Sequence, residues 1–183
     1  MFCVNYIASC QKSDGSFALK PNGFLSLLPT SGLAVRSLSW LGGLDRIDKD
    51  RCVSYLASCQ GKDGSFSLVP SPIISEILFK AVVILIKMKE LSLVGHMIGK
   101  KMPMERKAIV PPALDYIAVS ALNILGASGK IDRDALLDFT LNCQNPDGGF
   151  GERPGAESEI RDTAHSVMTL NELGAIPRVG ASN

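Results

Sequence analysis

The sequence predicts an all-α fold, an array of about four helical hairpins packed side by side. A signature with an aromatic residue, Cys-Gln, Asp-Gly and Phe occurs three times, as YIASCQKSDGSF (6–17), YLASCQGKDGSF (55–66) and FTLNCQNPDGGF (139–150). An apolar stretch of helical length follows each copy, and no long stretch alternates with the period of two that indicates strands. Because one hairpin cannot bury its own apolar face, neighbouring hairpins must pack together.

The three copies of the signature set the spacing of the repeat. Cys10, Cys59 and Cys143 each stand directly before the glutamine of a copy, and the second interval is close to twice a single repeat. A divergent unit without the signature is therefore expected between the second and third copies. The chain is predicted to form one domain over 1–183, with units near 1–47, 48–94, 95–131 and 132–176.

Within each unit we expect an outer helix, a corner and an inner helix. Asp-Gly suits the tight turn of the corner, because glycine tolerates positive φ and aspartate can bond its own backbone. The phenylalanine that follows is expected to pack under the corner, and the cysteine to be a small buried residue. Inner helices are predicted over 27–41, 74–89, 113–125 and 158–173.

Two outer helices are expected to begin at aspartate N-caps. The strings LGGLDRIDKD (41–50) and LGASGKIDRD (125–134) place Ile-Asp at the same point of two units. An N-cap carboxylate accepts hydrogen bonds from backbone amides that otherwise lack a partner, so Asp48 and Asp132 are predicted caps. The same acidic residues would also suit an acid–base group, but their repetition favours the capping role.

The amino-acid composition of the chain limits the kinds of partner that it can bind. The chain has 183 residues, 46% of them hydrophobic, and a formal net charge of +1, so it can bury a core and offers no electrostatic case for nucleic acid. The most apolar window, 73–94, contains five charged residues and is expected to be a buried helix, not a transmembrane segment. The first residues do not resemble a signal peptide, and five cysteines favour the reducing cytoplasm.

The repeated corner and the string that follows its third copy resemble those of a known family. The Q-x-x-x-G-x-F corner is similar to the repeat of squalene and other triterpene cyclases, with Phe in place of Trp. The longer string CQNPDGGFGERPGAES (143–158) resembles the β subunits of protein prenyltransferases, especially the geranylgeranyl type. The resemblance implies an α/α toroid in which a zinc ion and a prenyl diphosphate meet in a central apolar funnel. Because a closed toroid needs more hairpins than this chain predicts, we expect an incomplete toroid, and either a homo-oligomer or a second subunit that completes it.

The resemblance does not extend to the zinc site. The family takes its zinc ligands from an Asp-x-Cys pair and a His, and these positions correspond here to Pro111, Ala113 and Asp162. The histidine that binds the diphosphate in the family corresponds to Glu159, whose carboxylate would repel a diphosphate. No metal ligands are therefore predicted, and zinc is not implied as a cofactor.

The polar start of the last inner helix, RDTAHS (161–166), holds the candidate catalytic residues. Asp162 and His165 stand three residues apart on one helix face, where they could share a proton or a metal. Arg153 and Arg161 are the nearest cations, and Asp115 begins the preceding inner helix at a similar level; these three are predicted to bind substrate. In the alternative interpretation, Asp162 or Thr163 helps to cap the helix and His165 is a partly buried histidine bonded to Asp162.

Two functions fit these observations. The first is a prenyltransferase-like domain that handles an isoprenoid and transfers a prenyl group from a prenyl diphosphate to an acceptor. The second is a non-catalytic helical-repeat scaffold that keeps the fold without the zinc site. Apolar residues on the inner helices would line an isoprenoid groove in the first case and form ordinary packing in the second; examples are Leu33, Trp40, Ile84, Ile117 and Val167.

Overall fold

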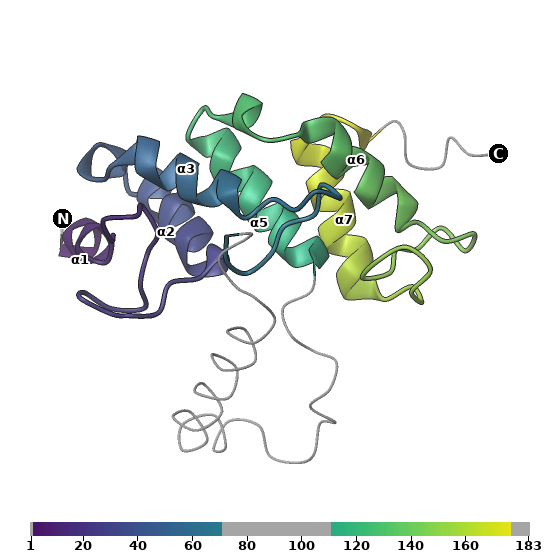
Figure 1. Ribbon diagram of the computed structural model, residues 1–183, viewed down its shortest axis with the longest axis horizontal. Helices are drawn as coiled ribbons and strands as arrows, with labels where there is room; N and C mark the ends of the chain where they lie inside the picture. The colour runs from purple at the N-terminus through teal and green to yellow at the C-terminus, as the bar shows by residue number, and fades with distance from the viewer. Residues whose placement is uncertain (1, 71–110, 177–183) are drawn as a thin grey trace, which may run out of the picture.

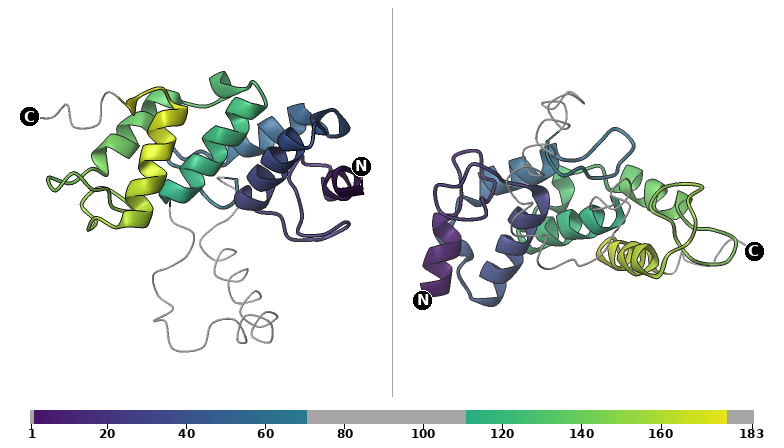
Figure 2. Two further views of the ribbon diagram at one scale, coloured as in Figure 1. Left: turned by 180° about the vertical axis from the view of Figure 1, so that it is seen from behind. Right: turned by 90° about the horizontal axis from the view of Figure 1, so that it is seen from below.

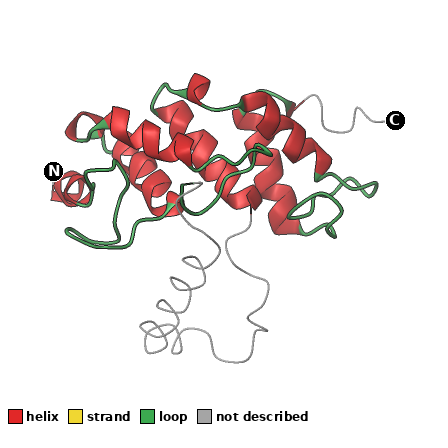
Figure 3. Cartoon of the chain, viewed as in Figure 1, coloured by secondary structure: helices red, strands yellow, loops and turns green. Residues whose placement is uncertain are grey.

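The computed structural model describes residues 2–70 and 111–176 (Figure 1). Every secondary-structure element assigned in these ranges is a helix, which confirms the all-α prediction (Figure 3). No described helix has the length and apolar character needed to cross a bilayer. The helices are α1 (Phe2–Ser9), α2 (Leu28–Trp40), α3 (Lys49–Ser58), α5 (Pro111–Ile124), α6 (Arg133–Asn142) and α7 (Ile160–Glu172), with short 3-10 turns η1 (Leu44–Arg46) and η2 (Ser128–Lys130).

The helices form two layers (Figures 1 and 2). The inner layer is a row of three helices in which α5 packs against α2 on one side and α7 on the other. The outer helices α1, α3 and α6 pack against this row. The alternation of outer and inner helices along the chain is that of an incomplete α/α toroid.

The core lies between the two layers and under the corners. Val35, Leu38 and Leu122 on the inner helices are fully buried, as is Leu56 on α3. The phenylalanine of each corner is also buried, so the predicted packing under the corner is confirmed in all three copies. These residues are Phe17, Phe66 and Phe150.

Each corner is anchored to the start of the inner helix that follows it. In all three copies the backbone N–H of the corner phenylalanine donates to a side-chain oxygen on that helix. The bonds run from Phe17 to Ser31 Oγ (2.9 Å), from Phe66 to Asp115 Oδ1 (2.7 Å) and from Phe150 to Thr163 Oγ1 (2.9 Å).

The predicted N-caps are confirmed, and they also join neighbouring hairpins. Asp48 Oδ1 accepts from the Arg51 N–H at 3.0 Å, and Asp132 Oδ1 from the Ala135 N–H at 2.9 Å. The backbone of each cap is held by the glutamine of the preceding corner. Gln11 Oε1 accepts from the Asp48 N–H (2.8 Å) while its Nε2 donates to the Asp48 carbonyl (2.9 Å), and Gln60 makes the same two bonds with Asp132 (both 2.8 Å).

The contacts of α5 correct the order of units predicted from the sequence. The bond between Phe66 and Asp115 makes α5 the inner helix of the second corner, and α5 lies directly beside α2. It therefore belongs to the second hairpin and not to a separate third unit. The predicted helix 74–89 and the predicted boundary near 95 lie outside the described residues. The described corners thus belong to three hairpins, which follow one another along the row.

Candidate functional site

The site is the inner face, defined as the face of α2, α5 and α7 turned away from the outer helices (Figure 2). On α2 this face is apolar and open: Leu33 is 57% exposed and Trp40 is 79% exposed. The two residues are seven apart, so they lie one above the other, on the side opposite the buried Ser31 and Leu38.

A single arginine crosses this face from α2 to α5. Arg36 donates one hydrogen bond to the Tyr116 hydroxyl at 2.7 Å and another to the Ser120 hydroxyl. Its guanidinium carbon lies 4.9 Å from the centre of the Tyr116 ring, a cation–π contact. Within 2–70 and 111–176 no carboxylate forms an ion pair with Arg36, and its side-chain hydrogen bonds there go to two hydroxyl groups. A guanidinium has five N–H donors, which leaves some of them for a ligand.

His165 extends the polar group to the third inner helix. Its ring centre lies 6.4 Å from that of Tyr116, with a tilt of 37° between the planes. The Nδ1 atom of His165 is buried and has no hydrogen-bond partner in the described part of the chain. Arg36, Tyr116, Ser120 and His165 will be called the inner-face cluster. One cation, two hydroxyls and an imidazole from three helices can receive an anion there.

The predicted pair of Asp162 and His165 is not formed. Asp162 is 2% exposed, and its two carboxylate oxygens accept from Arg161 at 3.0 and 3.4 Å. Neither does it cap α7, whose N-cap residue Glu159 makes no side-chain capping bond. Asp162 therefore serves to hold Arg161, while His165 turns toward Tyr116.

The predicted cations Arg153 and Arg161 already have acidic partners. Arg153 pairs with Glu152 at 2.9 Å and is largely exposed. Arg161 pairs with both Asp162 (3.0 Å) and Glu159 (3.6 Å). The hydrogen bond to Asp162 raises the pKa of Arg161 above its usual value. These ion pairs reduce the attraction of either arginine for a diphosphate, whereas Arg36 has no such partner in the described residues.

Asp115 does not reach the open face. It is 1% exposed and accepts the Phe66 N–H, so it supports the second corner. Burial raises the pKa of its carboxyl group well above the usual value, although the Phe66 hydrogen bond acts in the opposite direction. The predicted substrate contact of Asp115 would thus need the corner to open.

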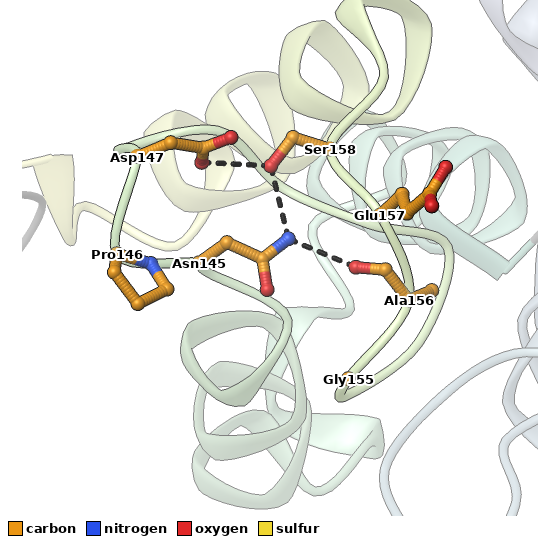
Figure 4. Close-up of a pocket in the computed structure, with 7 residues that line it drawn as sticks. All are labelled: Asn145, Pro146, Asp147, Gly155, Ala156, Glu157 and Ser158. Carbon is orange, nitrogen blue, oxygen red and sulfur yellow. Dashed lines mark hydrogen bonds between the residues drawn. The ribbon is translucent and has the colours of Figure 1, made fainter.

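The loop after the third corner is closed by its own hydrogen bonds (Figure 4). Asn145 Nδ2 donates to the Ala156 carbonyl and to Ser158 Oγ, both at 2.9 Å, and the Ser158 hydroxyl donates to Asp147 at 2.8 Å. The open hollow beside these groups has a volume of about 540 Å³. Its lining residues include Asp147 and Glu157 and no lysine or arginine, so it does not favour a phosphate.

The described residues do not fit a zinc ion. Nowhere among them do three His, Cys, Asp or Glu side chains converge on one point. All five cysteines are free, but a zinc-bound cysteine must be a thiolate. Burial, assisted by the charges of Asp115 and Asp162, raises the pKa of Cys143 to about 12, which keeps its thiol protonated.

Comparison with known proteins identifies the family. The family model of the prenyltransferase alpha-alpha toroid domain matches residues 2–179, and the chain belongs to this family. It is 44% identical over 61 residues to the geranylgeranyl transferase type-2 subunit beta of Saccharomyces cerevisiae, which is 33% of this chain and 17% of that protein. It is 32% identical over 82 residues to the protein farnesyltransferase subunit beta of Pisum sativum, which is 44% of this chain and 20% of that protein.

A third relative is also a β subunit of a prenyltransferase and is also matched over a short segment. The geranylgeranyl transferase type-1 subunit beta of Arabidopsis thaliana is 34% identical over 61 residues, 33% of this chain and 16% of that protein. The matched segments thus span a fifth or less of the length of these relatives.

Sequence reasoning missed Arg36 and Tyr116. Both residues lie inside predicted helices, and nothing in the repeat marks them. A usable signal was the composition of α2, LPTSGLAVRSLSW, in which Arg36 is the only charged residue. A lone arginine on an otherwise uncharged inner helix needs a partner, and its position in the middle of the helix points to the neighbouring inner helix.

Proposed function

We propose that the chain is a prenyltransferase-like domain whose inner face binds a prenyl diphosphate. Arg36 binds the diphosphate, with Tyr116 and His165 beside it, and the exposed apolar side chains of Leu33 and Trp40 contact the isoprenoid. The observation that carries this proposal is the environment of Arg36, whose described hydrogen-bond partners are two hydroxyl groups and no carboxylate. Arginine with free N–H groups is well suited to bind phosphate oxygens.

Family membership supports prenyl transfer as the reaction. When a prenyl group leaves its diphosphate, negative charge grows on the leaving oxygen, and a fixed cation stabilises that charge. The relatives are named as β subunits of transferases, so a second subunit is also part of the proposal. In this assignment Asp162 orients Arg161 at the edge of the site and Asp115 supports the corner. All five cysteines are free, as is usual for proteins of the reducing cytoplasm, so the cytoplasm is the proposed location.

The test measures binding of a fluorescent geranylgeranyl diphosphate analogue to the full chain, with and without zinc. We expect weak, zinc-independent binding. Arg36→Ala should raise Kd about 10- to 100-fold, because a hydrogen bond to a charged group contributes about 1.5–3 kcal/mol. Arg153→Ala is the matched control, since Arg153 is exposed and paired with Glu152. Equal Kd values for Arg36→Ala and the unchanged chain would remove the proposed site, and tight binding that requires zinc would restore a metal-dependent transferase.

A non-catalytic scaffold is the second candidate, favoured by the state of the cysteines. Burial raises the pKa of Cys52 and Cys59 to about 12, as at Cys143, so these thiols are not ionised at neutral pH. A scaffold needs only the stacked hairpins. It predicts no difference in Kd between Arg36→Ala and Arg153→Ala.

A further inference from the structure

Gly32 lies inside the inner helix α2, where a glycine is unfavourable. A glycine in a helix interior lowers stability relative to alanine, because its backbone loses more conformational freedom on folding. Gly32 also lacks the positive φ by which the turn glycines of this chain are explained. The backbone conformation therefore gives no reason for a glycine here, and the reason must lie in the packing of α2.

The packing of α2 on α5 supplies this reason. The two helices lie side by side in the inner layer (Figure 1). A Cβ added at Gly32 would overlap Ile117 Cγ2 and would lie 3.2 Å from the Ile117 carbonyl oxygen. Both atoms yield little, because the first is the branch methyl of a side chain with a restricted χ1 and the second is backbone of α5. A methyl group at position 32 would therefore push the two helices apart.

The same joint between inner helices occurs a second time in the row, with different residues. The glycines that follow α2, α5 and α7 all have positive φ and align the three helices; they are Gly42, Gly126 and Gly174. In this alignment Gly32 corresponds to Tyr116, and Ile117 corresponds to His165. The contact of Gly32 with Ile117 is thus repeated by Tyr116 and His165, whose ring centres lie 6.4 Å apart. An aromatic ring occupies the second joint, whereas a glycine lets the first one close.

The first joint lies beside the contacts of Arg36. Gly32 stands about one helical turn before Arg36, and Ile117 directly follows Tyr116. Arg36 donates to the Tyr116 hydroxyl at 2.7 Å and to the Ser120 hydroxyl, and its guanidinium carbon lies 4.9 Å from the Tyr116 ring centre. Hydrogen bonds of this kind weaken beyond about 3.2 Å, so a separation of the helices by about 0.5 Å would loosen them.

We infer that Gly32 is a positioning residue of the inner-face cluster, because it lets α2 approach α5 closely enough to hold Arg36 on Tyr116 and Ser120. Gly32 offers no side chain to a ligand and acts through Arg36. The placement of Arg36 is a property of the chain without a ligand, whereas its consequence for diphosphate binding rests on the proposed function. The two parts are therefore tested separately.

The first test needs no ligand and uses nuclear magnetic resonance. The Arg36 Nε–H signal is assigned as the one lost in Arg36→Lys, and Tyr116→Leu gives its position without the aromatic ring. We expect Gly32→Ala to move the signal toward that position. Gly32→Ala/Ile117→Ala, which lacks the overlapping methyl group, should restore it. Gly129→Ala is the matched control and should leave the signal unchanged, because a Cβ added at Gly129 meets no atom within 4 Å.

The second test measures Kd of the fluorescent geranylgeranyl diphosphate analogue for the full chain. Gly32→Ala should raise Kd about 10-fold, since hydrogen bonds to a charged group lose much of their contribution when they are misaligned. In an Arg36→Ala background the same change should leave Kd unchanged, because Gly32 acts only through Arg36. A general disturbance of the fold would raise Kd by the same factor in both backgrounds and would overturn the inference.

The remaining outcomes are also decisive. A folded Gly32→Ala chain with an unchanged Arg36 signal would overturn the inference. If Gly32→Ala does not fold, a folded Gly32→Ala/Ile117→Ala chain with the natural signal supports it, and a double variant that is unfolded or has a displaced signal overturns it. If Arg36→Ala leaves Kd unchanged, the proposed diphosphate site fails, while the signal measured without ligand still decides the role of Gly32.

Discussion

Asp115 occupies a position that is serine in the first hairpin and threonine in the third. All three side chains accept the N–H of a corner phenylalanine, but a hydroxyl does so without bringing a charge into the core. Because Asp115 is almost fully buried, its ionised form is disfavoured, and its pKa rises well above the usual 3.8. One acidic residue thus makes the stability of the corner dependent on pH.

The sign of this dependence follows from proton binding. Above about pH 3.8 the unfolded chain releases the Asp115 proton while the folded chain keeps it, so unfolding becomes more favourable as pH rises. The stabilisation is fully present below the unfolded pKa and is lost as pH increases through the folded pKa. We expect Asp115→Asn, which keeps an acceptor for Phe66, to reduce this loss. Urea unfolding in a series of buffers measures it.

Asp147 provides the control with the opposite sign. Hydrogen bonds from the Gly149 N–H and the Ser158 hydroxyl lower its pKa, so its contribution is present above the unfolded pKa and is lost as pH falls through the folded one. Asp147→Asn should therefore weaken the pH dependence on the acidic side only. If Asp115→Asn left the slope above pH 3.8 unchanged, the assigned state of Asp115 would be wrong.

Prediction of single residues succeeded where the cause was local. The caps Asp48 and Asp132 and the buried corner phenylalanines follow from turn and helix-end chemistry that a short string contains. The inner-face cluster depends instead on which helix lies beside α2, and a single sequence does not state that. For the same reason Asp162 and His165 were predicted as a pair although Asp162 bonds to the adjacent Arg161.

At the scale of the element, the corner is the unit that repeats most closely. Gly64 and Gly148 have nearly the same φ, +90° and +84°, so alanine would cause similar backbone strain at both. They differ in their surroundings, since only Gly64 lies against the backbone of Ala135. A comparison of the two substitutions therefore isolates the contact between hairpins.

We expect Gly148→Ala to lower the free energy of unfolding by about 1–2 kcal/mol, from strain alone. Gly64→Ala should cost about 1–3 kcal/mol more, because the methyl group forces α6 away from the corner. Chemical denaturation of the two variants measures the difference. If both variants lost the same free energy of unfolding, the close contact between Gly64 and α6 would not contribute to stability.

The elements themselves were largely predictable, but their grouping was not. The outer and inner helices of the first and last hairpins were expected from periodicity and from the signature, and they are present. The helix predicted over 113–125 is also present as α5. The prediction placed α5 in a divergent third unit because it assumed that the hairpins follow one another at regular intervals of sequence. The hydrogen bond from Phe66 to Asp115 instead joins α5 to the second corner, and these two residues lie far apart in the sequence.

Over the whole molecule, stability is distributed unevenly along the array. A large core joins α2, α3, α5 and the first two corners, and a smaller one, including Leu137, Phe150 and Leu170, lies in the third hairpin. α1 has no buried residue. In an array of stacked units, each unit is stabilised mainly by its neighbours, so the ends should open first.

Hydrogen exchange should follow this order. We expect the amides of α2 and α5 to exchange most slowly, those of α6 and α7 faster, and those of α1 fastest, because local opening of α1 exposes the least core. Exchange followed by mass spectrometry on the full chain gives these rates. Equal protection of α1 and α5 would show that the array unfolds only as a whole.

The bond between a corner glutamine and the next cap involves the backbone of the cap alone. Such a joint depends on the conformation of the incoming helix and hardly at all on its side chains. Hairpins of quite different sequence can therefore be joined in series, and the number of units in a chain can change without a new interface having to arise. The residues of the inner face have no such freedom, since their chemistry depends on the particular side chains that three adjacent helices bring together.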